Sequence, residues 1–280
     1  MDISKVLIAL DSSADTRSLE GVGFASVPLK IITSQKEYVD DETLDTRAMI
    51  KELAAYSGKS GTSCPAPDDW IKAFGEYEYI FCVTITGTLS GSNNSANLAK
   101  REYEEVHPDR KVFVLDSLSA GPELMLIAER IRKLVLDGKS FEDVCAETEE
   151  YAKNTALIFM LESMRNLANN GRVSPIVAKI AGLLGIRVVG KASEKGDLEP
   201  LEKARGSIKA IASIVSQMKK CGYRGGAVRI GNVENVSGAE TLKQMLLKEF
   251  PEADITVYPS MGLCCFYAEK GGLMIGFEHG

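Results

Sequence analysis

Apolar segments that each end in a run of polar residues alternate with amphipathic stretches through the first half of the chain. Their length and β-branched residues are typical of buried strands. Strands are predicted at Lys5–Leu10, Ile80–Thr86 and Lys111–Leu115. Helices are predicted at about residues 43–56, 67–75, 92–105, 122–137 and 140–153. Because strands that alternate with helices form mainly parallel sheets, we expect an α/β domain here, flanked by helices.

The pattern changes after about residue 155. Strands are predicted at Ala156–Leu161, Ile186–Gly190, Leu198–Leu201, Ala227–Gly231, Asp254–Tyr258 and Gly272–Phe277. Helices are predicted up to Asn169, at Ile176–Leu184, at Gly206–Lys220 and from a Ser237 cap to Phe250. The Leu and Ile residues along 176–188 are expected in the core. We therefore expect an α/β domain at 1–155 and an α+β domain at 156–280, with a ligand between them.

A loop rich in Gly, Ser, Thr and Asn, Gly87–Ala96, follows the second predicted strand and opens a helix. Backbone N–H groups, the helix dipole and the hydroxyls of Ser90 and Ser92 favour a bound anion there. No Lys follows the glycines as in a P-loop, and the G-x-G-x-x-G pattern is absent. The anion is then neither a nucleoside triphosphate nor a dinucleotide. The alternative is that the loop is only a connection.

Composition narrows the possible functions. The net charge is -6 over 280 residues, which argues against a nucleic-acid partner. No apolar run approaches the ~20 residues of a membrane span. Six scattered cysteines without C-x-x-C spacing suit reduced thiols in the cytoplasm. The only two histidines, His107 and His279, have neither triad partners nor metal-ligand spacing, which disfavours a His-dependent hydrolase or a zinc enzyme.

Two further functions remain open at this point. A loop Ser or Thr with Asp11 or Asp116 as the base is compatible with a phosphatase or an acyl hydrolase. The same loop is also compatible with a protein that binds another anionic small molecule. Neither alternative is supported by a recognisable set of catalytic or metal-binding residues.

Seven segments of the chain, in order, carry a resemblance to a known family. They are Asp11–Asp15, Val27–Leu29, Thr62–Pro65, Leu89–Ala96, Leu115–Ala120, Gly171–Val173 and Pro200–Gly206. Over essentially its full length the sequence resembles the DegV family of bacterial fatty-acid-binding proteins. The resemblance implies two domains that enclose one long-chain fatty acid in a buried tunnel. It also implies a fatty-acid kinase partner that phosphorylates the bound acid to an acyl-phosphate, with transient membrane contact possible.

The resemblance also assigns site residues. It implies that Thr62, Ser90 and Gly91 hold the carboxylate, and that Arg172 and Arg205 lie at the head-group mouth. Ser92 belongs to the same loop, and Tyr267 stands where family members usually carry a His. On this analogy the protein has no catalytic residue, metal or cofactor of its own, and the kinase performs the chemistry.

Overall fold

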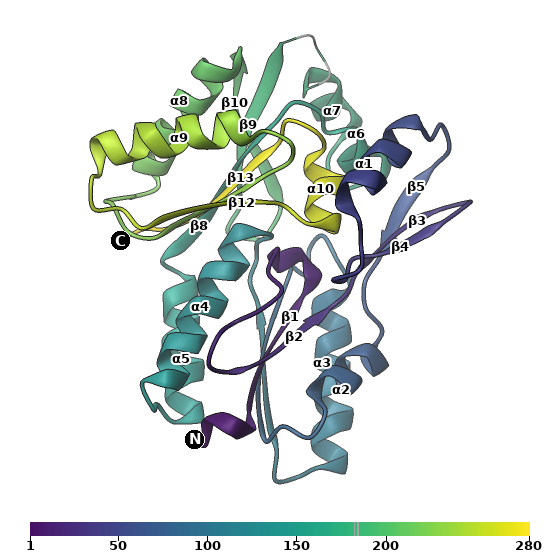
Figure 1. Cartoon of the computed structure of the whole chain (residues 1–280), viewed down its shortest axis with the longest axis vertical. Helices are drawn as coiled ribbons and strands as arrows, with labels where there is room; N and C mark the ends of the chain where they lie inside the picture. Colours follow the sequence, from purple (N-terminus) through teal and green to yellow (C-terminus); the bar gives the residue numbers. More distant parts are fainter. Residues whose placement is uncertain (182, 184) are drawn as a thin grey trace.

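The computed structural model describes residues 1–181, 183 and 185–280, and it contains two layered units, one below the other in Figure 1. The lower unit is built on a four-stranded sheet of order β2-β1-β6-β7 in which every neighbouring pair is parallel. Its strands are β1 (Val6–Asp11), β2 (Gly23–Val27), β6 (Tyr79–Thr84) and β7 (Lys111–Asp116). The predicted parallel α/β sheet is confirmed, with β2 as a strand that the sequence pattern did not reveal.

Helices cover both faces of this sheet. They are α2 (Pro67–Phe74) and α3 (Ser92–Val106) on one face, and α4 (Pro122–Leu136) and α5 (Phe141–Ala152) on the other. Alternate residues of β1 point to opposite faces: Leu7 packs with Trp70 of α2, whereas Ile8 packs with Leu124 of α4. Because both faces are covered, the two central strands β1 and β6 carry apolar side chains at nearly every position.

The upper unit is built on a six-stranded sheet of order β10-β9-β8-β13-β11-β12. Its strands are β8 (Thr155–Leu161), β9 (Ile186–Ala192), β10 (Leu198–Arg205), β11 (Val228–Asn232), β12 (Ile255–Pro259) and β13 (Leu273–Glu278). All neighbouring pairs are antiparallel except β11 and β12. The expected α+β character of this half is confirmed.

The two faces of the upper sheet are covered differently. Helices α8 (Ser207–Lys220) and α9 (Val236–Glu249) pack on one face. The short helices α6 (Arg165–Asn169), α7 (Pro175–Ala181) and α10 (Gly262–Ala268) lie on the other. The second face is the one toward which the candidate site opens.

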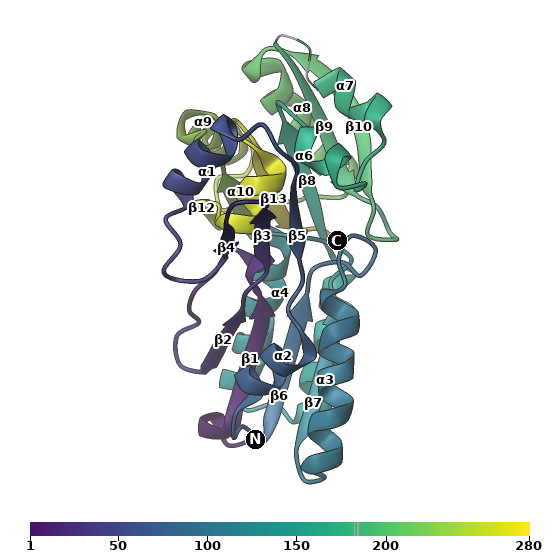
Figure 2. The same cartoon turned by 90° about the vertical axis from the view of Figure 1, so that its right-hand side faces the viewer.

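A small antiparallel sheet of order β4-β3-β5 links the two units. It consists of β3 (Lys30–Thr33), β4 (Glu37–Val39) and β5 (Ser60–Ser63), with α1 (Thr46–Ala55) between β4 and β5. Figure 2 shows this sheet beside α10. Ile31, Tyr38 and Met49 share a core with Leu157 and Phe159 of β8. Residues early in the chain therefore help to build the core of the upper unit, and the division at residue 155 stays a prediction.

Some local predictions differ from the structure. The cap of α9 is Asn235, whose side chain accepts a hydrogen bond from Gly238 N, so the predicted Ser237 cap is wrong. Positions 182 and 184 of the predicted helix at 176–184 lie outside the described residues. The expectation that the Leu and Ile residues along 176–188 lie in the core is wrong for Ile176 and Leu183, which are 75% and 59% exposed. Apolar residues near one another in sequence do not fix which face of a short helix is covered.

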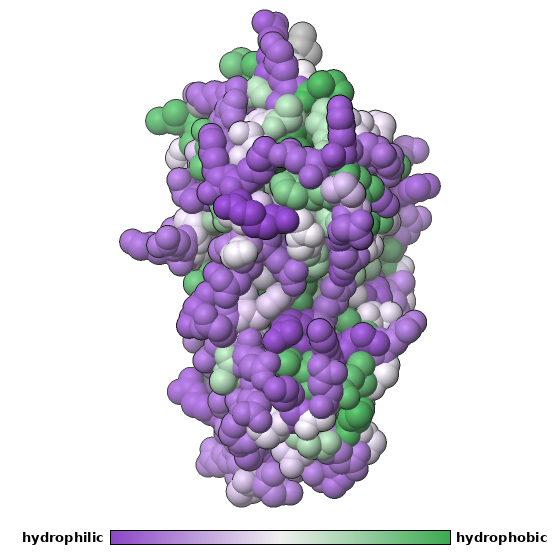
Figure 3. Space-filling view, turned by 90° about the vertical axis from the view of Figure 1, so that its left-hand side faces the viewer, coloured by the Kyte–Doolittle hydropathy of each residue, from purple (hydrophilic) through white to green (hydrophobic). Residues whose placement is uncertain are grey.

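The surface face in Figure 3 is mostly hydrophilic, with hydrophobic residues scattered over it. Within the described ranges no helix is both long and apolar enough to cross a membrane.

Buried polar contacts join the two units where α4 begins. A Cβ at Gly276 of β13 would lie 2.5 Å from Pro122 C and Glu123 N, so only glycine allows this approach of helix and strand. Glu123 is 4% exposed, and its Oε1 lies 2.8 Å from Thr155 Oγ1. The Thr155 hydroxyl also lies 3.1 Å from Ala152 O. One hydroxyl proton cannot serve both acceptors fully, whereas a protonated Glu123 can donate to Thr155. Burial raises the pKa of Glu123 to about 7.

We predict that Glu123→Gln stabilises the protein increasingly as the pH rises. A carboxyl whose pKa is raised by folding favours the folded state below its unfolded pKa, and this contribution is lost as the pH rises through the folded pKa. The free energy of unfolding of Glu123→Gln minus that of the parent should therefore increase by about 2 kcal/mol between pH 5 and pH 8. Denaturant titrations at several pH values measure it. Glu149→Gln, at an exposed position of α5, is the control, and a flat difference for Glu123→Gln would contradict the prediction.

Candidate functional site

An apolar cavity lies between the two units. Its empty volume, including the part open to solvent, is about 710 Å³. Both units and the small linking sheet contribute to its wall. The apolar lining residues are Leu29, Ile85, Leu89, Ala120, Leu157, Phe159, Leu161, Leu167, Leu198, Leu263, Cys264, Ala268 and Met274.

Strand β8 forms one wall of the cavity. Leu157, Phe159 and Leu161 line it, whereas Ile158 and Met160, which alternate with them, pack in the core that contains α8 residues. The strand is apolar at both sets of positions, which predicts cover on both faces. This apolar pattern alone does not assign these residues to the site, because it does not distinguish a cavity from a packed layer on one face of the strand.

Four polar side chains gather at one end of this lining: Thr62, Ser90, Arg172 and Tyr267. Thr62 lies in β5 and Tyr267 in α10, and their hydroxyl oxygens are 2.7 Å apart in a hydrogen bond. Ser90 Oγ accepts a hydrogen bond from Ser92 N at 3.2 Å. Its own hydroxyl proton has no acceptor among the residues that the structure describes, and it is therefore available to a ligand.

Arg172 is held beside these hydroxyls by backbone acceptors. Its Nε donates to Leu89 O at 3.1 Å and its Nη1 donates to Asn170 O at 2.6 Å. The guanidinium carbon lies 5.9 Å from the centroid of the Tyr267 ring. The side chain pairs with no carboxylate among the described residues. Its positive charge is thus directed at the polar end of the cavity rather than neutralised.

A second, polar hollow adjoins this end of the cavity. Its lining residues are Gly87, Thr88, Leu89, Ser90, Gly91, Asn93, Asn94, Asn170, Gly171, Arg172 and Asp197. Leu89, Ser90 and Arg172 line both spaces. Gly91 lines only the outer hollow, and a Cβ there would lie 3.0 Å from Cys64 Sγ. Ser90 and Arg172 therefore stand where an apolar interior meets a polar exterior.

Ser92 does not belong to this lining. It is fully buried, and its hydroxyl donates to Asp11 Oδ2 at 2.6 Å. Asp11 also accepts from Ile85 N at 2.9 Å. Asp116 accepts from Gly87 N and Leu118 N. The loops that follow β1, β6 and β7 lie together, and these two carboxylates hold the loops to one another instead of facing Ser90.

Arg205 is the other assigned residue that lies away from the cavity. It is exposed and stands at the far end of β10 from Leu198, opposite Ile186. At ~3.3 Å per residue, the seven-residue separation from Leu198 corresponds to roughly 20 Å along the strand. It lines neither the cavity nor the polar hollow. Of the two arginines, the structure brings only Arg172 to the polar end.

Comparison with known proteins identifies the family. The family model described as "Uncharacterised protein, DegV family" matches residues 5–279. The chain belongs to the DegV family. A DegV domain-containing protein of Streptococcus pneumoniae is 45% identical over 275 residues, which cover 97% of this chain and 98% of the relative.

Solved structures of the DegV family agree closely with the fold. One is a DegV family protein from Eubacterium eligens loaded with heptadecanoic acid, with a TM-score of 0.97, 40% identity and coverage of 98% of this chain and 100% of that one. Another is the Streptococcus pneumoniae fatty acid kinase B3 protein loaded with linoleic acid, with a TM-score of 0.97, 44% identity and coverage of 98% and 99%. The two-unit architecture is thus that of the DegV family.

Tyr267 gives this DegV protein a neutral hydroxyl at the polar end. Burial raises the pKa of Tyr267 above its usual value, although the Thr62 hydrogen bond and the Arg172 charge oppose the shift. The phenol therefore stays protonated at neutral pH and can donate a hydrogen bond. Within the described ranges, no group of three or more His, Cys, Asp or Glu residues is arranged to hold a metal ion.

Proposed function

We propose that this protein binds one long-chain fatty acid, with the acyl chain in the apolar cavity, the carboxylate at Thr62, Ser90 and Tyr267, and Arg172 beside them at the mouth. One observation carries the proposal: among the residues that the structure describes, the cavity is lined by apolar side chains except for a cluster of three hydroxyls and one arginine. A ligand that matches it must be apolar over most of its length and anionic at one end. The E. eligens and S. pneumoniae structures, described with heptadecanoic and linoleic acid, support this ligand class.

Burial of the acyl chain supplies most of the binding free energy, and the hydrogen bonds to the carboxylate set the orientation of the ligand. Each buried methylene contributes ~0.8 kcal/mol, so a sixteen-carbon chain offers on the order of 10 kcal/mol before ordering costs. Hydrogen bonds to a charged group contribute ~1.5–3 kcal/mol each, much of which offsets lost hydration.

We further propose that the protein carries the acid for a fatty-acid kinase and does not itself catalyse a reaction. The polar hollow outside Ser90 and Arg172 leaves an approach to the carboxylate from the protein surface. The name of the S. pneumoniae relative as a fatty acid kinase B3 protein supports a kinase partner. The alternative, a Ser/Thr hydrolase using Asp11 or Asp116, has less support because both carboxylates are engaged in loop contacts.

A cytoplasmic location fits this proposal. All six cysteines are free thiols, and free thiols are typical of proteins in a reducing compartment.

The proposal is tested by identifying what the purified protein carries. Denaturation and solvent extraction followed by mass spectrometry should release fatty acid in a near 1:1 ratio to protein. Addition of a fatty acid to lipid-free protein should raise its melting temperature, because the ligand binds only the folded form. Folded protein that yields no acyl species and gains no stability from added fatty acid would contradict the proposal.

We predict that Arg172→Ala separates binding from turnover. The added phosphate group carries more negative charge than the carboxylate, so loss of the guanidinium should change fatty-acid affinity by less than about threefold but lower kinase-dependent acyl-phosphate formation by at least tenfold. Binding assays and turnover with the kinase subunit measure the two quantities. Arg205→Ala is the control for a remote arginine, and it should leave affinity unchanged. Equal loss of binding and turnover in Arg172→Ala would place Arg172 in the carboxylate site instead.

A further inference from the structure

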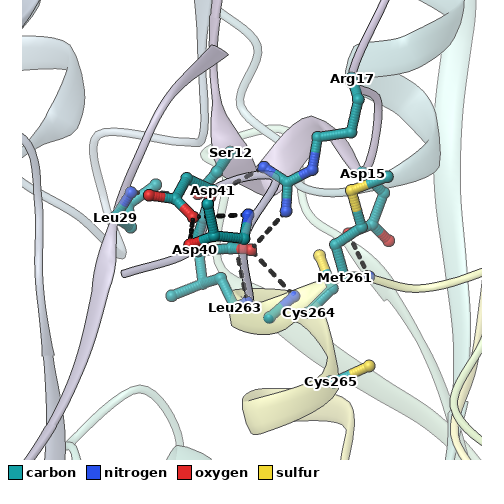
Figure 4. Close-up of polar contacts among 12 residues, drawn as sticks. Ser12, Asp15, Arg17, Leu29, Asp40, Asp41, Met261, Leu263, Cys264 and Cys265 are labelled. Atoms are coloured by element: carbon teal, nitrogen blue, oxygen red, sulfur yellow. Dashed lines mark hydrogen bonds and ion pairs between the residues drawn. The ribbon is translucent and has the colours of Figure 1, made fainter. Parts of the chain in front are cut away.

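The start of α10 is held by two carboxylates that lie more than 200 positions earlier in the chain. Asp40 is fully buried, and its Oδ1 and Oδ2 accept hydrogen bonds from Gly262 N at 3.0 Å and Leu263 N at 2.9 Å. Asp15 Oδ1 accepts from Met261 N at 3.0 Å. Figure 4 shows these side chains converging on the first turn of the helix. No local residue caps this helix with its side chain.

Arg17 balances the charge of Asp40. Its Nη2 lies 3.1 Å from Asp40 Oδ1, and its Nη1 donates to the backbone oxygen of Asp40 at 2.9 Å. Three N–H donors thus meet the two carboxylate oxygens, an arrangement that suits the ionised form, which only accepts. Burial raises the pKa of the Asp40 carboxyl, and the Leu263 hydrogen bond and the Arg17 charge oppose this shift.

The contact leaves little freedom in where α10 begins. A Cβ at Gly262 would lie 2.6 Å from Asp40 Oδ1, so glycine is required for the carboxylate to approach. The helix has only seven residues, and helices this short are not stable on their own. Its position must therefore come from tertiary contacts, and Asp40 supplies the two hydrogen bonds at its first turn.

The same helix builds part of the candidate site. Leu263, Cys264, Tyr267 and Ala268 of α10 all line the cavity. Tyr267 follows Gly262 by five residues, or about 7.5 Å along the axis at ~1.5 Å per residue. A shift or rotation at the first turn therefore displaces the phenol from Thr62, with which its hydroxyl makes the 2.7 Å hydrogen bond.

We infer that Asp40, with Arg17 as its counter-ion, is a positioning residue for the head group: it fixes the start of α10 and thereby holds Tyr267 against Thr62. The inference rests on the proposed function, since it assigns Asp40 a part in carboxylate binding. Asp40 itself lines neither the cavity nor the polar hollow, so it acts through Tyr267 and not by touching the ligand.

The test is a double-mutant cycle with two ligands. The proteins are the parent, Asp40→Asn, Tyr267→Phe and the double variant, and the ligands are oleic acid and its methyl ester. An Asn at 40 presents an NH₂ to one of the two backbone N–H groups, which then loses its acceptor. We expect Asp40→Asn to lower the affinity for oleic acid by about tenfold and the affinity for the methyl ester by less than twofold. In the Tyr267→Phe background, the loss of affinity for the acid should fall below about twofold.

Two additional variants keep the test decisive. Asp45→Asn is the matched control, because Asp45 caps α1 through Ala48 N and α1 contributes no residue to the cavity lining. Arg17→Gln covers the case in which Asp40→Asn does not fold, since the Arg17 side chain is 26% exposed and its loss leaves the cap in place. Arg17→Gln should lower the affinity for oleic acid by about threefold and leave the affinity for the methyl ester unchanged.

The outcomes separate the possibilities. An equal loss for acid and ester, or a loss for the acid that persists in Tyr267→Phe, would show that Asp40 only stabilises the fold and would overturn the inference. Unchanged binding of oleic acid in folded Asp40→Asn would overturn it as well. A folded parent protein that binds neither ligand would overturn the proposed function itself.

Discussion

Ala268→Phe is expected to abolish fatty-acid binding while the protein remains folded. Ala268 is 3% exposed in α10 and lines the apolar cavity, so a phenyl ring at this position occupies space that the acyl chain needs. We expect the affinity to fall by at least 100-fold, because the displaced methylenes each contribute ~0.8 kcal/mol. The ring enters empty apolar volume, so the lipid-free variant should melt near the temperature of the lipid-free parent.

Titration with a fluorescent fatty acid and thermal melts of lipid-free protein measure these two effects. Ala268→Ser is the matched control, because it keeps the residue small and should retain binding. Folded Ala268→Phe that binds like the parent would show that the acyl chain lies elsewhere.

The second large effect is expected from the hydroxyls at the polar end. Thr62→Val and Ser90→Ala each remove one donor from a partly desolvated carboxylate, which costs ~1–3 kcal/mol. The double variant should lose about 2–4 kcal/mol, less than the sum of the single losses, because the acid can protonate or recruit water once its site is half dismantled. Thr62→Val keeps the shape of the side chain, so its effect reports the hydroxyl.

Affinities of the three variants for the free acid and for its methyl ester distinguish the possible roles, with circular dichroism to confirm the fold. Affinity equal to that of the parent in all three would place the head group elsewhere. Equal losses for acid and ester would mean that these residues shape the cavity and do not hold charge.

The large elements were predictable because their signals are local. The helices predicted at 122–137 and 140–153 are found as α4, which has Pro122 at its first position, and α5, at whose start the Ser140 side chain accepts a hydrogen bond from Asp143 N. The apolar runs of β6 and β7 are long enough to be recognised as strands. Their parallel order also brings the loops that follow them to one edge of the sheet, and Gly87–Ala96 is one of these loops.

The small linking sheet and α10 were not predicted. Strand β5 (Ser60–Ser63) has neither an apolar run nor an alternating pattern, and its four residues gain their strand geometry from pairing with β3. The first N–H groups of helix α10, at Gly262 and Leu263, donate to Asp40, which lies 222 and 223 positions away. Such elements depend on partners distant in sequence, so local propensity carries little information about them.

The sequence by itself determined the fold class, the loop after β6 and the polar residues available to it. Only the tertiary structure decided which of them face the ligand space. Ser90 and Ser92 are two positions apart, yet Ser90 lines the cavity whereas Ser92 is turned to Asp11. Arg172, which follows α6, meets Tyr267 of α10 because both helices lie on the same face of the upper sheet, while Arg205 is left at the end of an outer strand. Side-chain direction in a loop or short helix is set by contacts between distant elements, and such contacts exist only in the folded chain.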